Sequence, residues 1–383
     1  MAEIRHLPLP IRGSASLAVE AGGLVFTSGL ALSPGERPLA PIEAVLDALG
    51  TGLPLAAKLK AYLSDIRRAP SLRRQLPDGP AATSMVGAML PDGVESLIEV
   101  IASAGVEPVR QAGGGGIGVT IIGDLLFADG ARPGRGGDLA GAGDLTAQAQ
   151  HVLDDILAAL APYGAGPADV LKINNTAACW HNYALYNAVY NERLTGANAA
   201  RCSVGGMLEH PLALIEVEAV AARGGPYRFV DSTQSGVGRT GFQPREDTVY
   251  LPELGPCKGP HSHGARVGEM VFIAGECPYD AQDRLVGPGD VAAQTVQTME
   301  NVRMSLEALG ASLADVVRTT ITLSDMRLFD DFDAAYAACF AGHYPARTVV
   351  GAPLGQYGLL VEIEAIAVIG AGRDGVFLTG QPA

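Results

Sequence analysis

The sequence is poor in lysine and in aromatic residues. Of 27 basic residues in 383, only four are Lys; aromatic residues make up 5% and the formal net charge is −14. No basic run alternates with aromatic residues, which argues against nucleic acid or an anionic membrane as a partner. No apolar run is long and uninterrupted enough to span a bilayer. We therefore expect neither a nucleic-acid nor a membrane partner.

Cysteine is sparse too, and its five positions include no CxxC spacing. This distribution favours reduced thiols in a cytoplasmic protein. The first ten residues lack the charged-then-apolar pattern of a secretion leader, which agrees with that expectation. The set Cys257, His261, His263 and Cys277 matches no recognised zinc spacing, so no metal site is predicted.

Against this background, apolar, strand-like sequence carries one Arg and one Glu fifteen residues apart. In the stretch 345–368 they are Arg347 and Glu362, and an upstream copy holds Arg201 and Glu216 at the same spacing. A lone Arg in apolar sequence needs a partner or an anionic ligand, because an unpaired buried charge costs several kcal/mol. Each pair is either an ion pair between neighbouring strands or the polar part of a carboxylate site.

A third, damaged copy lies at 80–101, where Ala82 takes the Arg position and Leu97 the Glu position. The chain is therefore predicted to contain three tandem repeats, two of which keep the charged pair. Their expected bounds are 1–109, 110–225 and 226–383, called repeats one, two and three below.

Each repeat has the pattern β-β-α-β-α-β-β. In repeat two, apolar residues recur at helical spacing over 145–164, and alternating segments before and after it predict strands. Repeat one has lost much of the corresponding helix. A Gly-, Ser- and Thr-rich segment at 230–249 is expected to be a linker or an arm, and the final residues, VFLTGQPA, are expected to be a tail.

The hairpins ending in Ser-Gly or Ala-Gly, the run LEALGASLADVVRTTITLSD and the motif PAR…VEIEAIAV resemble the Rid (YjgF/RidA) family of enamine/imine deaminases. The resemblance implies an α+β fold of three chorismate-mutase-like domains, each a mixed sheet with two helices on one face. Family members are homotrimers with sites between subunits. Three copies in one chain thus imply an intramolecular pseudo-trimer, present as a monomer or as a dimer of it.

The same resemblance assigns roles to the charged pairs. Arg347 and Arg201 would hold the carboxylate of a 2-imino acid, which suits a guanidinium that can donate two parallel hydrogen bonds. Glu362 and Glu216 would hold the water that attacks the imine carbon. No cofactor is required, since that carbon is already electrophilic. Arg347 with Glu362 and Arg201 with Glu216 are therefore the two expected sites, with repeat one as a wall.

The resemblance also implies substrate-binding positions, although the match there is weaker. They are Gly275, Gly130, His261, Asn187 and Asp333. Gly275 and Gly130 follow the hairpin strands and are otherwise ordinary turn glycines, and His261 replaces a family Tyr and is otherwise structural. The family's Ser before the hairpin glycine is Ser28, Asp129 or Ala274 here. These departures put the family's usual substrate range in doubt.

The leading prediction is a hydrolase that deaminates a C=N or enamine carbon of a small carboxylate substrate. One alternative is a ring or amide hydrolase like the cyanuric acid hydrolases, since Lys58, Lys172 and Arg318 recur at equivalent positions, although no Ser recurs with them. A chorismate-type lyase on the same scaffold is a further alternative. The last is a non-catalytic protein that binds a small metabolite.

Overall fold

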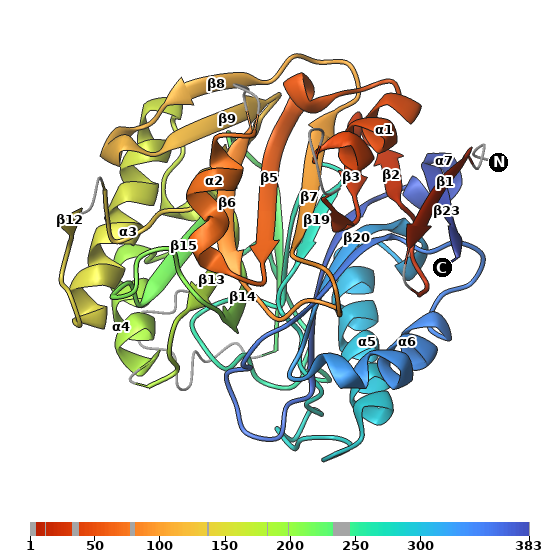
Figure 1. Cartoon of the computed structure of the whole chain (residues 1–383). Helices are drawn as coiled ribbons and strands as arrows, with labels where there is room; N and C mark the ends of the chain where they lie inside the picture. Colours follow the sequence, from red (N-terminus) through yellow and green to blue (C-terminus); the bar gives the residue numbers. More distant parts are fainter. Residues whose placement is uncertain are drawn as a thin grey trace.

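Three mixed β-sheets with helices on their outer faces make up the protein (Figure 1). The computed structural model describes residues 5–11, 13–32, 38–76, 81–135, 138–181, 183–197, 199–232 and 246–382. In Figure 1, α3 and α4 lie on one side, α5 and α6 on another, and α1 and α2 over a third sheet. The predicted α+β class and the threefold repeat are confirmed. In the described part of the chain, no helix is both long and apolar enough to cross a membrane.

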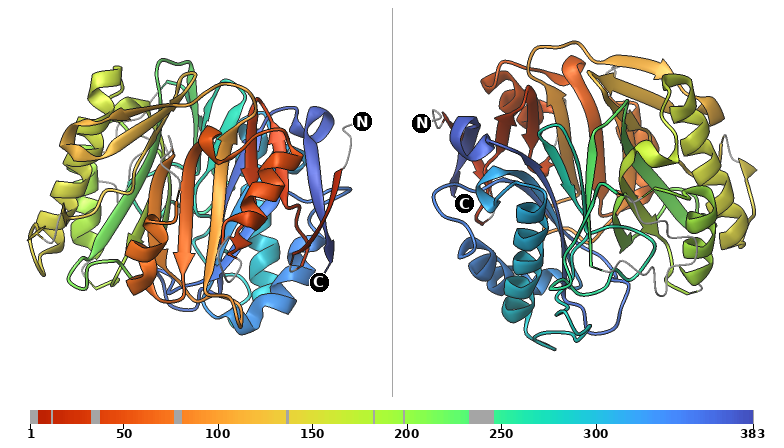
Figure 2. Two further views of the ribbon diagram at one scale, coloured as in Figure 1. Left: turned by 45° about the horizontal axis from the view of Figure 1, so that its top comes forward. Right: turned by 180° about the vertical axis from the view of Figure 1, so that it is seen from behind.

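The first sheet has the strand order β1-β23-β2-β3-β7-β5-β6, and β4 pairs with β7. Its strands are β1 (Arg5–Ile11), β2 (Ala18–Ala21), β3 (Leu24–Thr27), β4 (Leu30–Ala31), β5 (Ala56–Leu63), β6 (Ala82–Gly87), β7 (Ser96–Ser103) and β23 (Val376–Pro382). The expected C-terminal tail thus forms β23, an inner strand of the first repeat's sheet, where it brings the two ends of the chain together (Figure 2).

The second sheet has the order β14-β13-β15-β10-β9-β8, and the third β17-β16-β18-β19-β22-β20-β21. The strands of the second are β8 (Val109–Ala112), β9 (Gly118–Ile122), β10 (Leu125–Ala128), β13 (Val170–Ala177), β14 (Ala200–Gly205) and β15 (Ile215–Ala222), beside a small ribbon of β11 (Gly134–Arg135) and β12 (Asp138–Leu139). Those of the third are β16 (Tyr227–Asp231), β17 (Thr248–Tyr250), β18 (Gly264–Val267), β19 (Met270–Ile273), β20 (Val316–Leu323), β21 (Ala346–Gly351) and β22 (Val361–Val368).

The helices show how far repeat one has diverged. They are α1 (Ala40–Ala48), α2 (Ala69–Arg73), α3 (Leu145–Leu160), α4 (Tyr183–Arg193), α5 (Val291–Ala308), α6 (Phe329–Ala337) and the short α7 (Ala371–Asp374). The caps of α3 and α5 are equivalent: Asp144 and Asp290 accept a hydrogen bond from the third residue that follows. Repeat one keeps only nine residues of this helix, as the sequence predicted.

The apolar core has two levels. Each repeat buries one face of its sheet under its own helices, and a further cluster joins all three repeats at the centre, with Phe26, Phe127 and Phe272 at equivalent positions. This central cluster makes the three sheets one folded unit, as the pseudo-trimer requires. The ends of the expected linker form β16 and β17; its middle, 233–245, lies outside the described residues. The domain boundaries stay a prediction.

Candidate active site between repeats two and three

One backbone hydrogen bond recurs at all three junctions between repeats. The N–H of the hairpin glycine donates to the carbonyl oxygen of the residue at the Arg position of the preceding repeat. The three bonds are Gly275 to Arg201 at 3.0 Å, Gly130 to Thr83 at 3.0 Å and Gly29 to Arg347 at 3.3 Å. Each Arg position therefore lies against the next repeat, and any site combines residues from two repeats.

This contact corrects one predicted equivalence. The residue of repeat one at the Arg position is Thr83, not Ala82: Thr83 lies opposite Leu59 on β5, as Arg201 lies opposite Ile173 on β13. The connection from β6 to β7 has eight residues, 88–95, whereas that from β14 to β15 has nine, 206–214. Because this connection is one residue shorter, counting fifteen residues back from Leu97 reaches Ala82 instead of Thr83. Leu97 does occupy the Glu position, opposite Tyr62.

The predicted pairing within each repeat is wrong. Arg201 and Glu216 of repeat two lie on β14 and β15, on either side of β13, and their partners on β13 are three residues apart. Strand spacings put such residues about 10 Å apart along the strand and about 10 Å across it. Arg201 instead lines a cavity together with Glu362 of repeat three. Within the described residues, this two–three interface is the only junction where the Arg position and the Glu position of the motif hold an Arg and a Glu.

The other two junctions each hold half of the pair. At the one–two interface, Glu216 accepts a hydrogen bond from Ser84 Oγ at 2.7 Å, and Thr83 stands where an Arg would. At the three–one interface, Arg347 forms an ion pair with Asp333 at 2.7 Å, and Leu97 stands where a Glu would. The two expected sites are therefore one complete site and two incomplete ones. Gly130 and Asp333 lie at the incomplete junctions.

Arg201 is positioned by neutral groups. It is 4% exposed, and its Nη1 donates to Oδ1 of Asn187 on α4 at 2.9 Å. The guanidinium carbon lies 4.8 Å from the centre of the Tyr190 ring, an orienting contact for a cation. In the described ranges no carboxylate forms an ion pair with Arg201. A neutral amide thus positions the guanidinium and leaves its charge for a bound anion.

Glu362 supplies a carboxyl group on the facing wall. It is 6% exposed, and the thiol of Cys202, next to Arg201, donates to its Oε1 at 3.2 Å. Burial raises the pKa of Glu362 to about 7, against the hydrogen bonds from Cys202 and the backbone of Ser203 that lower it. A Cβ atom at Gly275 would overlap Oε1, so glycine is needed to make room for this carboxyl group.

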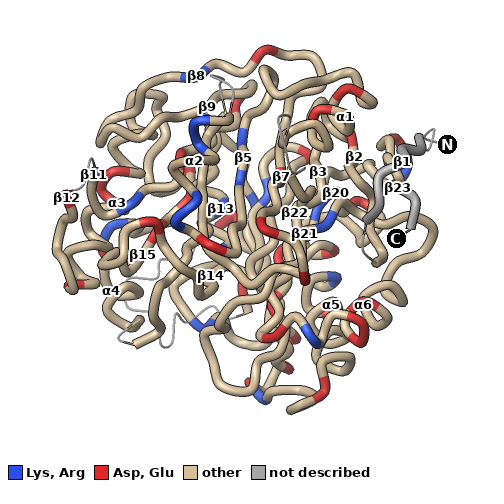
Figure 3. Tube along the Cα trace, viewed as in Figure 1, with Lys and Arg blue, Asp and Glu red and all other residues tan. Residues whose placement is uncertain are grey.

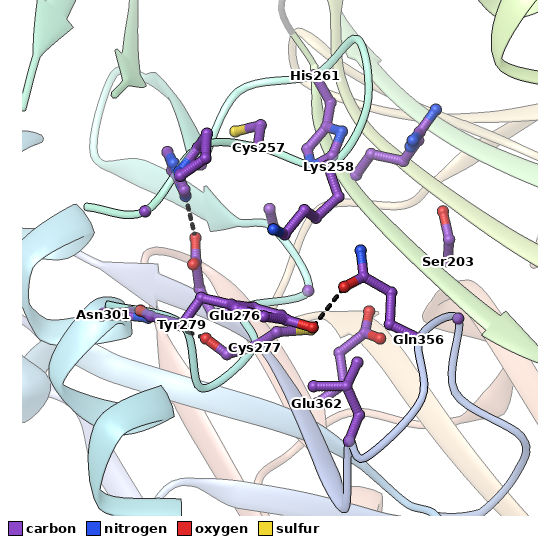
Figure 4. A pocket seen from close by; sticks show the side chains of 18 of the residues that line it. Ser203, Cys257, Lys258, His261, Glu276, Cys277, Tyr279, Asn301, Gln356 and Glu362 are labelled. Carbon is purple, nitrogen blue, oxygen red and sulfur yellow. Dashed lines mark hydrogen bonds and ion pairs between the residues drawn. The ribbon is translucent and has the colours of Figure 1, made fainter. Parts of the chain in front are cut away.

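The cavity between these groups has a volume of about 170 Å³ and opens to solvent. Figure 4 shows side chains that line it. His261 and Asn187 line it, as do all members of the Cys/His set considered above for a metal. The sequence did not single out Lys258, Tyr279 or Gln356, which also line it. They lie in loops after 250, 274 and 351, and no periodic pattern marks such positions. Figure 4 shows Gln356 accepting a hydrogen bond from Tyr279 beside Glu362.

Comparison with known proteins identifies repeats two and three. The sequence model of the endoribonuclease L-PSP family matches residues 117–223 and 255–369, more than half of the chain. This chain belongs to that family, the RidA/YjgF family. Repeat one lies outside both matched segments, in keeping with its short helices and lost charges.

Single-domain relatives match about one repeat. A RutC family protein of Pyrococcus horikoshii is 40% identical over 109 residues, 28% of this chain and 86% of the relative. The 2-iminobutanoate/2-iminopropanoate deaminase of Escherichia coli K12 is 37% identical over 113 residues, 29% of this chain and 88% of the relative. The crystal structure of a chorismatase matches 92% of this chain and 99% of its own at 16% identity, with a TM-score of 0.62. That likeness shows a shared whole-chain fold.

In this RidA/YjgF protein, the second Glu of each EIE-type motif has a structural place. Figure 3 shows basic positions on β5 and β20 toward the middle of the view. These side chains form a cycle of buried ion pairs between repeats: Lys58 with Glu218 at 2.6 Å, Lys172 with Glu364 at 2.7 Å and Arg318 with Glu99 at 3.4 Å. The recurring basic residues thus join the repeats, and the first Glu of each motif remains for the junctions.

The pKa of Glu218 reflects that cycle. Burial alone would raise it, but the charges of Lys58 and Lys60 outweigh burial and lower the pKa to about 2. Glu218 is therefore ionised wherever the protein is folded at ordinary pH. Glu362, two positions before the equivalent residue on β22, has the opposite shift and titrates near neutrality.

Proposed function

We propose that the two–three interface deaminates a small 2-imino carboxylate to the 2-keto acid and ammonia. The observation that carries this proposal is that Arg201 and Glu362, from different repeats, line one cavity, while each partial pair elsewhere lacks its counterpart. The deaminase name of the Escherichia coli relative, at 37% identity, supports the choice of reaction.

In the proposed mechanism, Arg201 binds the substrate carboxylate through two hydrogen bonds. Glu362, when ionised, accepts a proton from a water molecule as the water oxygen bonds to the imine carbon. The C=N electron pair moves to nitrogen, which takes up a proton. The carbinolamine then loses ammonia and leaves the keto acid. A carboxyl group with a pKa of about 7 can both accept the first proton and return it.

The test uses imino acids generated in place from 2-amino acids by an amino-acid oxidase. Wild-type protein should accelerate the appearance of ammonia and 2-keto acid well above spontaneous hydrolysis. The non-catalytic binding protein would be favoured by two results together: no acceleration with any small imino acid, and protection of the protein against thermal unfolding by pyruvate or 2-oxobutanoate that depends on Arg201.

The ion pairs of Lys58, Lys172 and Arg318 favour the imine reaction over a Ser–Lys hydrolase.

A second candidate is a reaction on a cyclic dicarboxylate such as chorismate. The observation that favours it is a second basic residue lining the cavity, Lys258, which also forms an ion pair with Asp283. Trp180, Tyr183 and Tyr279 add aromatic surface that a ring could contact. Incubation with chorismate, with pyruvate release as the readout, separates this candidate from the imine reaction.

A further inference from the structure

A thiol, an imidazole and a carboxylate lie together in the wall of the cavity, and the proposed deamination uses none of them. Nδ1 of His263 lies 2.8 Å from Oε1 of Glu276. His263 is 6% exposed and Glu276 4% exposed, so this bond is shielded from water. An ionised carboxylate can only accept, so Nδ1 carries the proton and Nε2 is directed elsewhere.

Nε2 of His263 is buried, and in the described part of the chain no hydrogen-bond partner meets ordinary geometry there. The group that acts on the ring besides Glu276 is the thiol of Cys257. Burial alone would lower the pKa of His263, but the charge of Cys257, then that of Glu276, and hydrogen bonds to both raise it well above its usual value. His263 and Cys257 line the same cavity, and an imidazole whose Nε2 has no partner of ordinary geometry can accept a thiol proton there.

Cys257 is also open to the cavity. It is partly exposed and lines the space that Arg201 lines. Figure 4 shows its sulfur at the top of the view and Glu362 at the bottom, and the dashed line at the Glu276 carboxylate marks the bond to His263. A small molecule held by Arg201 can therefore meet this sulfur without entering the protein core.

We propose that Cys257, His263 and Glu276 form a nucleophilic thiol site that takes soft carbon electrophiles carrying a carboxylate. The order thiol, imidazole, carboxylate is the arrangement that activates a cysteine and orients its base. His263 takes the thiol proton at Nε2 and sulfur bonds to the electrophilic carbon. A 2-halo acid then loses halide. An unsaturated acid instead accepts the electron pair at its α-carbon, which takes the proton back from the imidazolium.

The other cysteines provide internal controls. Cys179 is exposed, and Cys202 is buried and donates to Glu362. Cys277 also lines the cavity, but burial and then the charges of Glu362 and Glu276 raise the pKa of its thiol well above the usual value. Cys277 is therefore expected to stay protonated and to react slowly. Cys257 is the cavity thiol that we expect to react.

The test labels the folded full-length protein with iodoacetate and, separately, iodoacetamide, and follows each cysteine by peptide mass spectrometry. Cys257 should react at least about tenfold faster than Cys179. Its ratio of iodoacetate to iodoacetamide rates should exceed that of Cys179 severalfold, because Arg201 attracts the carboxylate. Equal rates at Cys257 and Cys179 would overturn the site, and equal reagent ratios would overturn its preference for carboxylates.

Two substitutions test the activation itself. His263→Asn should slow labelling of Cys257 at least about tenfold at pH 6.5, and Glu276→Gln severalfold. Between pH 8 and 6 the wild-type rate should fall less steeply than that of His263→Asn, which lacks the group that takes up the thiol proton. The charged and titratable groups that line the cavity around this pair are Glu276, Cys277, Lys258, His261, Arg201, Glu362, Tyr183 and Tyr279. Continued protection of the buried Cys202 from labelling shows that a variant is folded. Wild-type pH dependence in both variants would overturn the assignment, whatever the outcome for deamination.

Discussion

The two–three and three–one interfaces each hold an Arg at the same backbone position, but the side chains around the two guanidinium groups differ in charge. Arg201 is positioned by the amide of Asn187 and faces Glu362, whereas Arg347 is paired with the carboxylate of Asp333 and faces repeat one, where Leu97 replaces the glutamate. A neutral partner leaves the guanidinium charge for a ligand, and an anionic partner consumes it. The junctions of this chain can diverge in this way because they are three separate stretches of sequence.

The one–two interface shows the reverse loss. Glu216 keeps its place, and Gly130 makes room for it, since a Cβ there would lie 2.5 Å from Oε1. Burial raises the pKa of Glu216 to about 7, the same value as for Glu362. A perturbed carboxyl group is therefore not enough to mark the proposed active junction; the one–two interface differs in having Thr83 at the position of Arg201.

The sharpest test of this comparison exchanges the two glutamates for glutamine. Glu362→Gln removes the proposed base and should lower kcat by about 10²- to 10⁴-fold. Glu216→Gln changes an equally buried carboxyl group at a junction where Thr83 holds the position of Arg201, and it should keep nearly full activity. Steady-state assays of ammonia release from an imino acid measure both. Equal losses in the two variants would contradict a single active junction.

The two arginines give the next largest difference. Arg201→Met removes a charge-assisted pair of hydrogen bonds to the substrate carboxylate, worth about 3 kcal/mol, and should lower kcat/KM about 100-fold. Arg347→Met is the matched control, since its partner Asp333 is 19% exposed at the side chain and can be hydrated. Loss of kcat/KM in Arg347→Met alone, with its thermal unfolding unchanged, would move the active junction to the three–one interface.

These two comparisons also show how far the sequence could lead. Alternating strands and two amphipathic helices per repeat reveal the fold, because burial of one face imposes those periods. The pairing of Arg201 with Glu362 is invisible in the sequence, since both fifteen-residue spacings join residues on different junctions. Because the connection between β6 and β7 is one residue shorter, the sequence comparison put Ala82 at the Arg position, which Thr83 occupies in the structure. Lys258 and Glu276 reach the cavity through loops, and Cys257 lies in the loop between β17 and β18, where no periodicity marks a residue.

A finer test converts one arginine environment into the other. Asn187→Asp gives Arg201 the carboxylate that Arg347 already has, so a substrate anion must compete with it. We expect KM to rise about tenfold, equivalent to about 1.4 kcal/mol, with kcat little changed. Asp333→Asn is the matched control and should leave both constants as they are. An unchanged KM in Asn187→Asp would show that the neutral partner does not explain why the two junctions differ.

The test with the smallest expected effect on activity concerns stability and compares Glu216 with Glu362. The pKa of Glu216 is raised from 4.5 to about 7 by burial. Between these pH values the native state holds a proton that the unfolded state has released, so the free energy of unfolding falls as pH rises. The decrease reaches about 3 kcal/mol above pH 7, because a pKa difference of one between the folded and unfolded states corresponds to about 1.4 kcal/mol. Glutamine stays neutral at every pH, and its Oε1 can still accept the Ser84 hydrogen bond. In urea unfolding, the midpoint of Glu216→Gln should therefore match that of wild type at pH 5 and be higher than that of wild type at pH 8. Glu362→Gln should show the same gain together with lost activity. A midpoint for Glu216→Gln that follows wild type at both pH values would show that this carboxyl group is not buried as a neutral acid, and that the two glutamates differ in more than the arginine they face.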